Sequence, residues 1–134
     1  MFIVVDASVW VARLVSEDVF HELVKAWMFA RLKEEDQFLS PSLLLAEIGG
    51  AISRRTTSSL GLKAIEYVQN LPGMQLVEME DSLLREAAQL AAELGLRGAD
   101  STYVAVAARL DLPLITLDID QRERAKKRVT VLEI

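Results

Sequence analysis

The sequence contains no cysteine and only one histidine. Charged residues interrupt every apolar run before it reaches the length of a membrane span. Without cysteine the chain can form no disulfide, no thiol nucleophile and no cysteine-based zinc site. His21 alone cannot build a histidine-rich metal site, gives a weak basis for a serine triad, and is expected to be an ordinary surface or boundary residue. These absences leave metal chemistry on oxygen ligands open.

The amino-terminal segment FIVVDASVW also lacks the features of a targeting segment. It has no basic region before its apolar residues, and it meets an acid at Asp6. Neither a signal peptide nor a membrane span fits this pattern, so we expect a cytoplasmic protein with no membrane contact. A length of 134 residues predicts one domain, residues 1–134, built on a single core.

The net charge of −5 argues against a nucleic-acid partner, because phosphates attract lysine and arginine. The charge is unevenly distributed, however. Residues 121–128 carry five basic residues and one acid, a local charge of +4 that leaves −9 for the rest of the chain. If several of the remaining acids bind divalent cations, the working site is much less negative than the whole chain.

Short apolar runs alternate with stretches of helical spacing along the whole chain. Ser40 before Pro41 predicts the start of a helix, because serine can cap and proline suits the first helical position. The other helices are expected over residues 7–16, 19–33, 62–71, 81–94 and 100–110, and after 120. Strands are expected at residues 2–5, 38–39, 74–79, 114–117 and, as an edge, 129–132. This alternation predicts a three-layer α/β sandwich with a mainly parallel sheet.

Glu47 interrupts the apolar face of its predicted helix. That face consists of Leu43, Leu44, Ile48, Ala51 and Ile52. An unpaired carboxylate in this position would cost several kcal/mol, so it must be protonated, paired with a base or bound to a metal. Arg54 and Arg55 lie two turns away and are poorly placed to pair with it.

Three further acids occupy positions where strands end or helices begin. Asp6 and Asp118 follow apolar strands, and the carboxyl ends of parallel strands are where open α/β sheets bind ligands. Asp100 continues the apolar face of the next helix, which includes Tyr103 and Ala107, so it points toward the sheet. Each acid alone can be interpreted as a helix cap, but their joint placement favours one site.

Carboxylates brought into contact repel each other and raise one another's pKa, and a divalent cation removes that cost. Oxygen ligands without histidine or cysteine favour Mg²⁺ or Mn²⁺. Such an ion can lower the pKa of a bound water and neutralise the leaving oxygen of a phosphodiester. The residues therefore point to phosphodiester hydrolysis.

Four segments in the right order also carry a resemblance: VVDASVW, SPSLLLAEIGGAISRR, RGADSTYVAVAARL and LPLITLDID. Together they resemble the acidic motifs of PIN-domain ribonucleases, in particular the VapC-type toxins of toxin–antitoxin pairs. The resemblance spans nearly the whole chain and implies a five-stranded sheet of order 3-2-1-4-5. It also implies cleavage of RNA with Mg²⁺ or Mn²⁺, a homodimer, and silencing by a cognate antitoxin protein of a type II system.

The same resemblance assigns roles to individual residues. The catalytic and metal-binding acids are Asp6, Glu47, Asp100 and Asp118, with Asp120 as a less constant fifth metal ligand, and Ser8 and Thr116 match the supporting hydroxyls. One departure is Gln121, which stands where many members have an aromatic residue. Independently of the family, Arg122 and Arg124 follow the last acids closely enough to reach phosphates beside the scissile one, and we expect them to bind RNA.

Two alternatives differ in class. A receiver-like phosphoacceptor domain also has a parallel sheet with aspartates on Mg²⁺, but it needs a lysine at the end of a late strand. The last candidate strand is followed by Glu133 and Ile134, with no lysine, and Glu47 would be unexplained. A non-catalytic RNA-binding module of the same fold is the second alternative, and the intact acidic set argues against it. The sequence identifies neither the RNA target nor the antitoxin.

Overall fold

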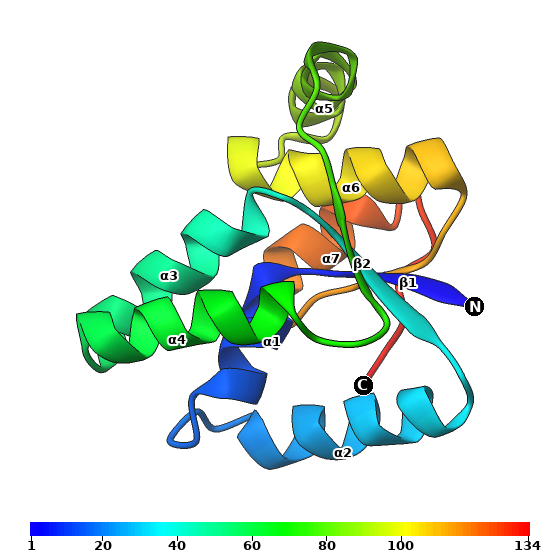
Figure 1. Cartoon of the computed structure of the whole chain (residues 1–134). Coiled ribbons are helices and arrows are strands. Elements are labelled where there is room, and N and C mark those ends of the chain that lie inside the picture. Colours follow the sequence, from blue (N-terminus) through cyan, green and yellow to red (C-terminus); the bar gives the residue numbers. More distant parts are fainter.

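The computed structural model describes all 134 residues and has seven helices and four strands, shown in Figure 1. The strands are β1 Phe2–Val5, β2 Gln37–Pro41, β3 Met74–Val77 and β4 Leu114–Ile115. The helices are α1 Ala7–Leu14, α2 His21–Lys33, α3 Leu44–Arg55, α4 Ser58–Gln69, α5 Asp81–Leu94, α6 Gly98–Leu110 and α7 Ile119–Ala125. The predicted alternation of strands and helices is confirmed.

All four strands are parallel and lie in the order β3-β2-β1-β4. β1 is central, and its residues Ile3, Val4 and Val5 are fully buried, as expected for an apolar run flanked by strands on both sides. Val5 pairs with Ile115 of β4, so both strands end side by side at the same edge of the sheet. This register places the residues after β1 next to those after β4.

Helices cover both faces of the sheet. α6 packs on β1, β2 and β4, and α5 packs on the outer side of α6. Figure 1 shows α6 and α5 above the sheet, α2 below it, and α3 with α4 extending together to one side. The middle of α6, from Ser101 to Ala107, is buried without interruption. The helix that carries Asp100 is therefore fixed against the strand that precedes Asp6.

The predicted fifth strand is not formed as a strand. Val131 makes a single parallel bridge to Leu114, with hydrogen bonds from the Leu114 N–H to Thr130 and from the Leu132 N–H back to Leu114. β4 has only two residues, so the carboxyl-terminal segment around Val131 finds too short an edge to form a strand beside it. The sheet order 3-2-1-4 agrees with the expected order, and a single bridge takes the fifth position.

The prediction that Ser40 and Pro41 start a helix is wrong, because both belong to β2. The Ser40 hydroxyl donates to the Val5 carbonyl at 2.5 Å and accepts from the Trp10 indole at 3.4 Å, so it joins β2 to β1 and α1 rather than capping a helix. Pro41 is the last residue of its strand. α3 begins only at Leu44, which places Glu47 in its first turn.

Boundaries elsewhere differ by a few residues. The polar segment before Gly61 was expected to be a break, yet α4 already begins at Ser58, capped by the Thr57 hydroxyl, which accepts from the Leu60 N–H at 3.2 Å. α6 begins at Gly98, so Asp100 lies in its first turn and Arg97 is its N-cap residue. In both cases the cap lies before the stretch with helical apolar spacing.

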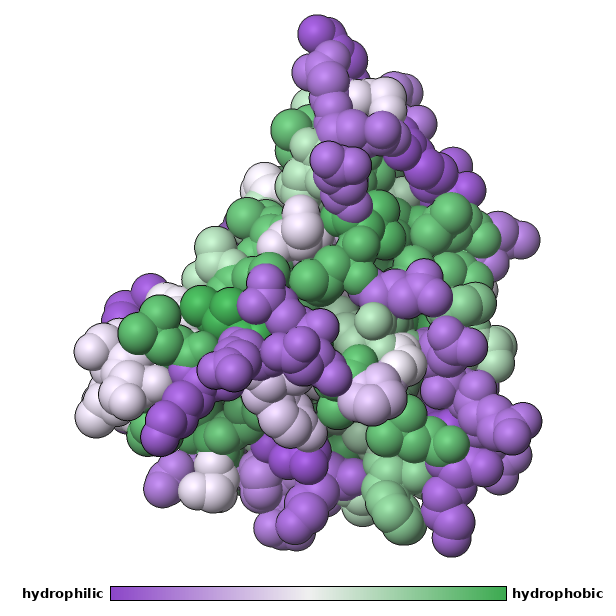
Figure 2. All heavy atoms as spheres, viewed as in Figure 1, coloured by the Kyte–Doolittle hydropathy of each residue, from purple (hydrophilic) through white to green (hydrophobic).

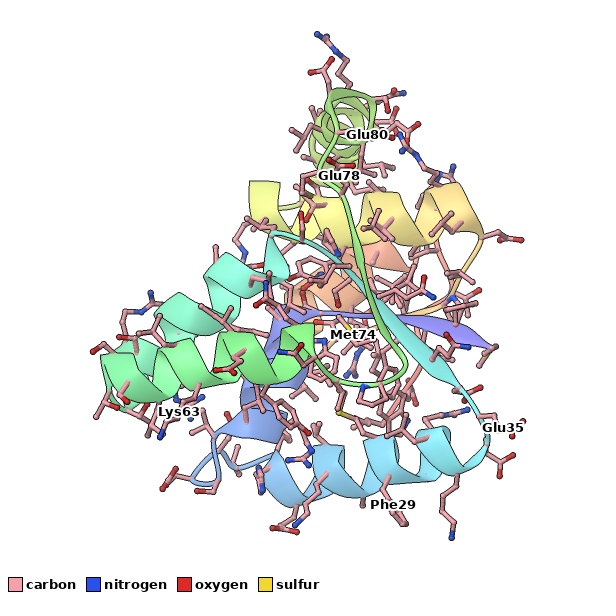
Figure 3. All side chains as sticks on the ribbon, in the orientation of Figure 1. Phe29, Glu35, Lys63, Met74, Glu78 and Glu80 are labelled. Carbon is pink, nitrogen blue, oxygen red and sulfur yellow. The ribbon has the colours of Figure 1, made fainter.

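The outer surface is mixed in polarity. Figure 2 shows hydrophilic side chains over the outer end of α5 and hydrophobic residues that reach the surface between α5 and the α3–α4 pair. Phe29 on α2 points away from the body of the protein and is 64% exposed (Figure 3). None of the helices combines the length and the apolar character needed to cross a membrane.

α3 and α4 pack closely because each has a glycine at their contact. A Cβ added at Gly61 would lie 2.8 Å from the Gly49 carbonyl oxygen and 3.2 Å from the Ser53 Cβ. A Cβ added at Gly49 would lie 2.7 Å from the Ile65 Cδ1. At Gly61 the two backbones can approach this closely only without a side chain, whereas at Gly49 the added atom would meet the end of the Ile65 side chain.

We expect Gly61→Ala to destabilise the protein. Overpacking against a backbone oxygen costs about 1–3 kcal/mol, which outweighs the gain in helix propensity of about 1 kcal/mol from alanine. Gly98→Ala is the matched control, because an added Cβ there meets no atom within 4 Å. Thermal melts should show a lower Tm for Gly61→Ala alone. Equal melting temperatures for Gly61→Ala and the wild type would contradict the close packing of α3 on α4.

Candidate active site

Asp6 follows β1 directly and is the N-cap residue of α1. It is buried, with 4% exposure, so its carboxylate needs hydrogen bonds from the protein. Its Oδ2 accepts from the Ser8 N–H at 3.1 Å, from the Ser8 hydroxyl at 2.6 Å and from the Thr116 hydroxyl at 3.0 Å. Its Oδ1 has only one long contact, 3.4 Å from the Gln121 Nε2, and is the oxygen available to a ligand.

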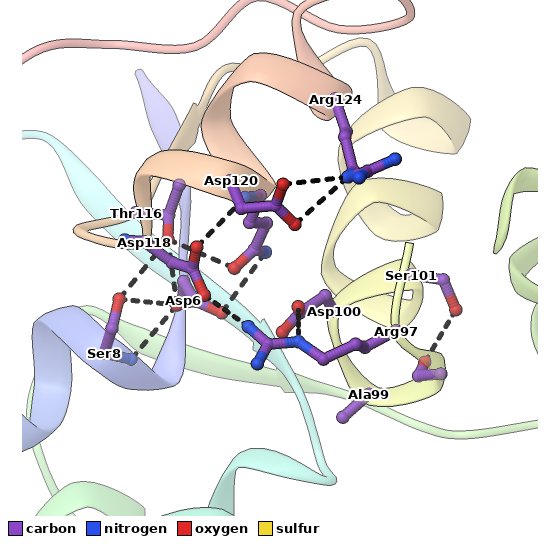
Figure 4. Close-up of polar contacts among 12 residues, drawn as sticks. Asp6, Ser8, Arg97, Ala99, Asp100, Ser101, Thr116, Asp118, Asp120 and Arg124 are labelled. Carbon is purple, nitrogen blue, oxygen red and sulfur yellow. Dashed lines mark hydrogen bonds and ion pairs between the residues drawn. The ribbon is translucent and has the colours of Figure 1, made fainter. Parts of the chain in front are cut away.

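Ser8 and Thr116 connect the end of β1 to the segment after β4 (Figure 4). Besides donating to Asp6, the Ser8 hydroxyl accepts from the Leu117 N–H at 3.0 Å. The Thr116 hydroxyl accepts from the Asp118 N–H at 3.1 Å. Both hydroxyls therefore hold the chain after β4 in place while they stabilise the Asp6 carboxylate.

Asp118 is the N-cap residue of α7, and its Oδ1 accepts from the Gln121 N–H at 3.0 Å. Gln121 is almost fully buried, and its side chain contacts Asp6 and Thr116. The cap thus fixes Asp118 at the start of α7, beside the site of Asp6. The other Asp118 oxygen, Oδ2, faces a cation.

That cation is Arg97, which bridges two of the predicted acids (Figure 4). Its Nε donates to the Asp100 Oδ2 at 2.9 Å, and its Nη2 donates to the Asp118 Oδ2. The Arg97 side chain is 70% exposed, whereas those of Asp100 and Asp118 are 16% and 27% exposed. The guanidinium covers the carboxylates from the solvent side, and the two ion pairs raise its own pKa.

Glu47 is held from the opposite side by Tyr103. The Tyr103 hydroxyl donates to the Glu47 Oε1 at 2.6 Å, which leaves Oε2 without a protein partner. Burial raises the pKa of the Tyr103 hydroxyl, and the hydrogen bond to Glu47 raises it further, so Tyr103 remains a neutral donor. This contact joins α3 to α6 and orients the glutamate.

The acids influence one another's protonation. Burial raises the pKa of Glu47, and the charges of Asp6 and Asp100 raise it further against the lowering effect of the Tyr103 hydrogen bond. Burial also raises the pKa of Asp100, and the charges of Asp6 and Asp118 raise it further. Arg97 lowers this pKa, but by less than the other effects raise it. The four predicted acids thus lie close enough to repel one another.

Asp120 and the two arginines after it are engaged elsewhere. Both Asp120 oxygens accept from the Arg124 Nε at 3.0 Å, and the Asp120 side chain is 66% exposed. Arg124 also donates to the Leu94 carbonyl at 3.3 Å. The Arg122 guanidinium donates to the Thr116 carbonyl at 3.3 Å. None of these three side chains makes a hydrogen bond or ion pair with the side chains of the four inner acids.

Sequence reasoning did not assign Arg97, Tyr103 or Gln121 to the site. Tyr103 was placed on an apolar face, which is correct for its ring but omits its hydroxyl. Gln121 was noted only as a departure from an aromatic residue. Its place directly after two acids, at the start of a predicted helix, could have indicated a polar contact within the site.

The chemistry of this donor set fits a divalent metal ion. All potential ligands are carboxylate oxygens, and the oxygens that lack a short hydrogen bond include the Asp6 Oδ1 and the Glu47 Oε2. As the side chains lie, no three acids are arranged as a ready metal site, because Asp100 and Asp118 turn to Arg97. The Arg97 guanidinium is the cation that pairs with these two carboxylates.

A parallel sheet flanked by helices, with a cluster of acids at its carboxyl edge, defines the class of protein as an α/β fold with an acidic site. Residues 3–127 match the family model of the PIN domain. The chain therefore belongs to the PIN-domain family, as its sequence motifs predicted. No curated protein matches the chain.

Solved structures share this fold over almost the whole chain. VapC20 of Mycobacterium tuberculosis, described as a sarcin-ricin loop cleaving toxin, has a TM-score of 0.75 at 19% identity, over 90% of this chain and 93% of that one. VapBC2 of Rickettsia felis, bound to a DNA fragment from its promoter, has a TM-score of 0.73 at 13% identity, over 98% of both chains. FitAcB of Neisseria gonorrhoeae has a TM-score of 0.71 at 20% identity, over 98% and 96%. At these identities the likeness establishes the fold.

The raised pKa of Glu47 predicts a pH dependence of stability without metal. Above the ordinary glutamate pKa of about 4.3, the folded protein binds more protons at this site than the unfolded chain does. This site therefore lowers stability as pH rises from that value through the raised pKa. Glu47→Gln removes the titration, and its amide oxygen can still accept from Tyr103.

We expect the stability of the wild type relative to Glu47→Gln to fall as pH rises through this window in chelator. Added Mn²⁺ should stabilise the wild type more than the variant, because the variant lacks one charge for the ion. Denaturant unfolding at several pH values, with chelator and with Mn²⁺, measures both effects. A constant difference across pH and an unchanged Mn²⁺ increment would exclude Glu47 from the site.

Proposed function

We propose that the protein is a Mg²⁺- or Mn²⁺-dependent endoribonuclease and the toxin of a type II toxin–antitoxin pair. The observation that carries the proposal is the gathering of four acids from four separate elements, two of which are bridged by the Arg97 guanidinium. These acids are Asp6 after β1, Glu47 on α3, Asp100 on α6 and Asp118 at the start of α7. Membership of the PIN family supports nuclease chemistry for such a site.

Asp6, Glu47, Asp100 and Asp118 would hold the metal, with Asp120 as a further ligand if it leaves Arg124. When bound, a divalent ion supplies Lewis acidity toward a phosphate oxygen and lowers the pKa of a coordinated water. The protein's own contribution is to hold the ligands still. Ser8 and Thr116 fix the Asp6 carboxylate through Oδ2 and leave Oδ1 free.

We assign Glu47 a second task, that of a general base. Its pKa is raised, and its Oε2 lacks a protein partner while Tyr103 holds Oε1. A carboxylate with these properties suits the role of proton acceptor for the water that attacks phosphorus, because a general base works best with a pKa near the working pH. Tyr103 acts as a positioning residue that fixes the direction of the free oxygen.

The partners follow from the structural relatives. VapC20 is described as a toxin that cleaves the sarcin-ricin loop, and VapBC2 was solved on promoter DNA. By analogy we propose an RNA substrate, a cognate antitoxin, a homodimeric state and a cytoplasmic location for this protein. Arg122 and Arg124 remain predicted RNA contacts, although their intramolecular hydrogen bonds would have to be exchanged for phosphates.

A receiver-like phosphoacceptor is less well supported. That chemistry needs a lysine beside the acceptor aspartate, and the cation beside these acids is Arg97. A purely binding module would not need four mutually repelling carboxylates at one place. Both alternatives leave the contact between Glu47 and Tyr103 without a purpose.

We expect the purified protein to cleave RNA with Mn²⁺ or Mg²⁺ and to stop in chelator. Asp6→Asn should lose at least about 2–4 kcal/mol of transition-state stabilisation, roughly 30- to 1,000-fold in rate, because the isosteric amide removes the charge that faces the ion. Asp81→Asn, an exposed change on α5, is the matched control and should retain activity. The measurement is the rate of cleavage of a labelled RNA.

Equal rates for the wild type and Asp6→Asn, with both proteins free of contaminating nuclease, would refute the catalytic assignment. Labelling of Asp6 by acetyl phosphate would favour the phosphoacceptor alternative instead. Activity that persists in chelator would refute the metal dependence.

A further inference from the structure

We propose that the RNA strand enters the site along α3, in a groove whose far end is formed by Arg54 and Arg55, which bind its phosphates. This inference rests on the proposed ribonuclease function and identifies the surface that holds the substrate. It differs from the path past Arg122 and Arg124 expected from the sequence.

A groove of about 700 Å³ opens beside the acidic site. Ser8, Glu47 and Asp118 line it at the catalytic end, and Arg54 and Arg55 line it at the other. Glu47 lies in the first turn of α3 and the two arginines lie in its last turn, so the groove follows the length of this helix. Arg122 and Arg124 do not line it.

The helical repeat places the key residues on one face. Arg54 comes seven residues after Glu47, which at 3.6 residues per turn brings it within about 20° of the same direction around α3. Ala51 lies between them on that face and also lines the groove. The distance along the helix axis is about 10 Å, or about three nucleotides at a rise of 3.4 Å for a stacked strand.

The Arg54 guanidinium is directed back toward the catalytic end. Its Nη1 lies against Gly50, where an added Cβ would be only 3.1 Å away. Gly50 is one turn before Arg54 and less than one turn after Glu47, so the guanidinium extends along α3 toward Glu47 without pairing with it. The Arg54 side chain makes no ion pair or hydrogen bond within the protein, unlike that of Arg55, so its donors are available to a phosphate.

Arg55 is partly anchored. Its Nη1 donates to the Asp18 Oδ2 at 2.9 Å, while the remaining donors of the guanidinium stay free. Burial raises the pKa of Asp18, but the Phe20 N–H and Arg55 lower it by more, so Asp18 stays ionised and holds Arg55 at the groove. An arginine held in this way loses less side-chain freedom when it binds a phosphate.

The groove also offers a surface for a base. Phe20 lines it, is 43% exposed, and lies between Asp18 and the start of α2. Stacking of a base on an aromatic ring is tolerant of sequence and complements phosphate contacts in single-strand binding. Arginines, an aromatic ring and a metal-binding acid site along one groove favour a single-stranded RNA over a protein segment, which would not need the free charge of Arg54.

The test measures RNA binding separately from cleavage. In an Asp6→Asn background with Mg²⁺, the affinity for a short fluorescent single-stranded RNA of mixed sequence is measured at several salt concentrations. Each phosphate contact contributes about 0.7 to the slope of log affinity against log salt for a single strand. Adding Arg54→Ala and Arg55→Ala should lower that slope by up to about 1.4. Affinity at 0.1 M salt should fall by roughly 25-fold.

Two further variants serve as controls. Lys25→Ala with Arg85→Ala removes the same charge from exposed positions on α2 and α5 and should leave the slope nearly unchanged. Ala51→Phe keeps both arginines but fills the middle of the groove, and it should weaken binding at every salt concentration. Circular dichroism and melting temperature confirm that each variant is folded.

The outcomes separate this inference from the proposed function. If the wild type cleaves RNA but the Arg54 and Arg55 variant keeps the parent slope, the groove inference is wrong and the ribonuclease proposal stands. The same conclusion follows if Arg122→Ala with Arg124→Ala lowers the slope and the Arg54 and Arg55 variant does not. If the wild type neither cleaves nor binds RNA, both proposals fail.

Discussion

The crowding of one buried and three partly buried carboxylates is the constraint on which the rest of this structure depends. Asp6, Glu47, Asp100 and Asp118 come from four elements. Burial raises the pKa of Glu47 and of Asp100, and the charges of the neighbouring acids raise both further. Placing such charges together without compensation costs several kcal/mol. The fold reduces this cost with hydroxyl and amide donors and with one arginine, and a divalent cation would compensate the charges more fully.

The parallel pairing of β1 with β4 makes this compensation possible. Val5 lies opposite Ile115, so the Asp6 carboxylate meets the Thr116 hydroxyl one residue further along each chain. Ser8 then returns from α1 to bind the Leu117 N–H. The donors that hold Asp6 are a direct result of strand register, and a shift of one residue would turn Asp6 and Thr116 to opposite faces of the sheet.

The sequence predicted those features that a single element expresses by itself. The burial of β1 was predictable because its residues form one continuous apolar run. The position of Glu47 was recognisable because it interrupts the helical spacing of apolar residues around it. The contact of Arg97 with Asp118 spans 21 residues, and that of Tyr103 with Glu47 spans 56, so neither leaves a local pattern. The error at Ser40 has the same origin, because its hydroxyl bonds to Val5 on another strand.

We propose that these acids form one cation site, from which a bound metal ion would displace Arg97. Calorimetric titration of Mn²⁺ into the wild type, Arg97→Ala and Asp118→Asn tests it most directly, with Arg85→Ala as a control for loss of a surface arginine. The account predicts tighter Mn²⁺ binding by Arg97→Ala, weaker binding by Asp118→Asn, and an unchanged affinity for Arg85→Ala. Equal Mn²⁺ affinities for all four proteins would contradict it.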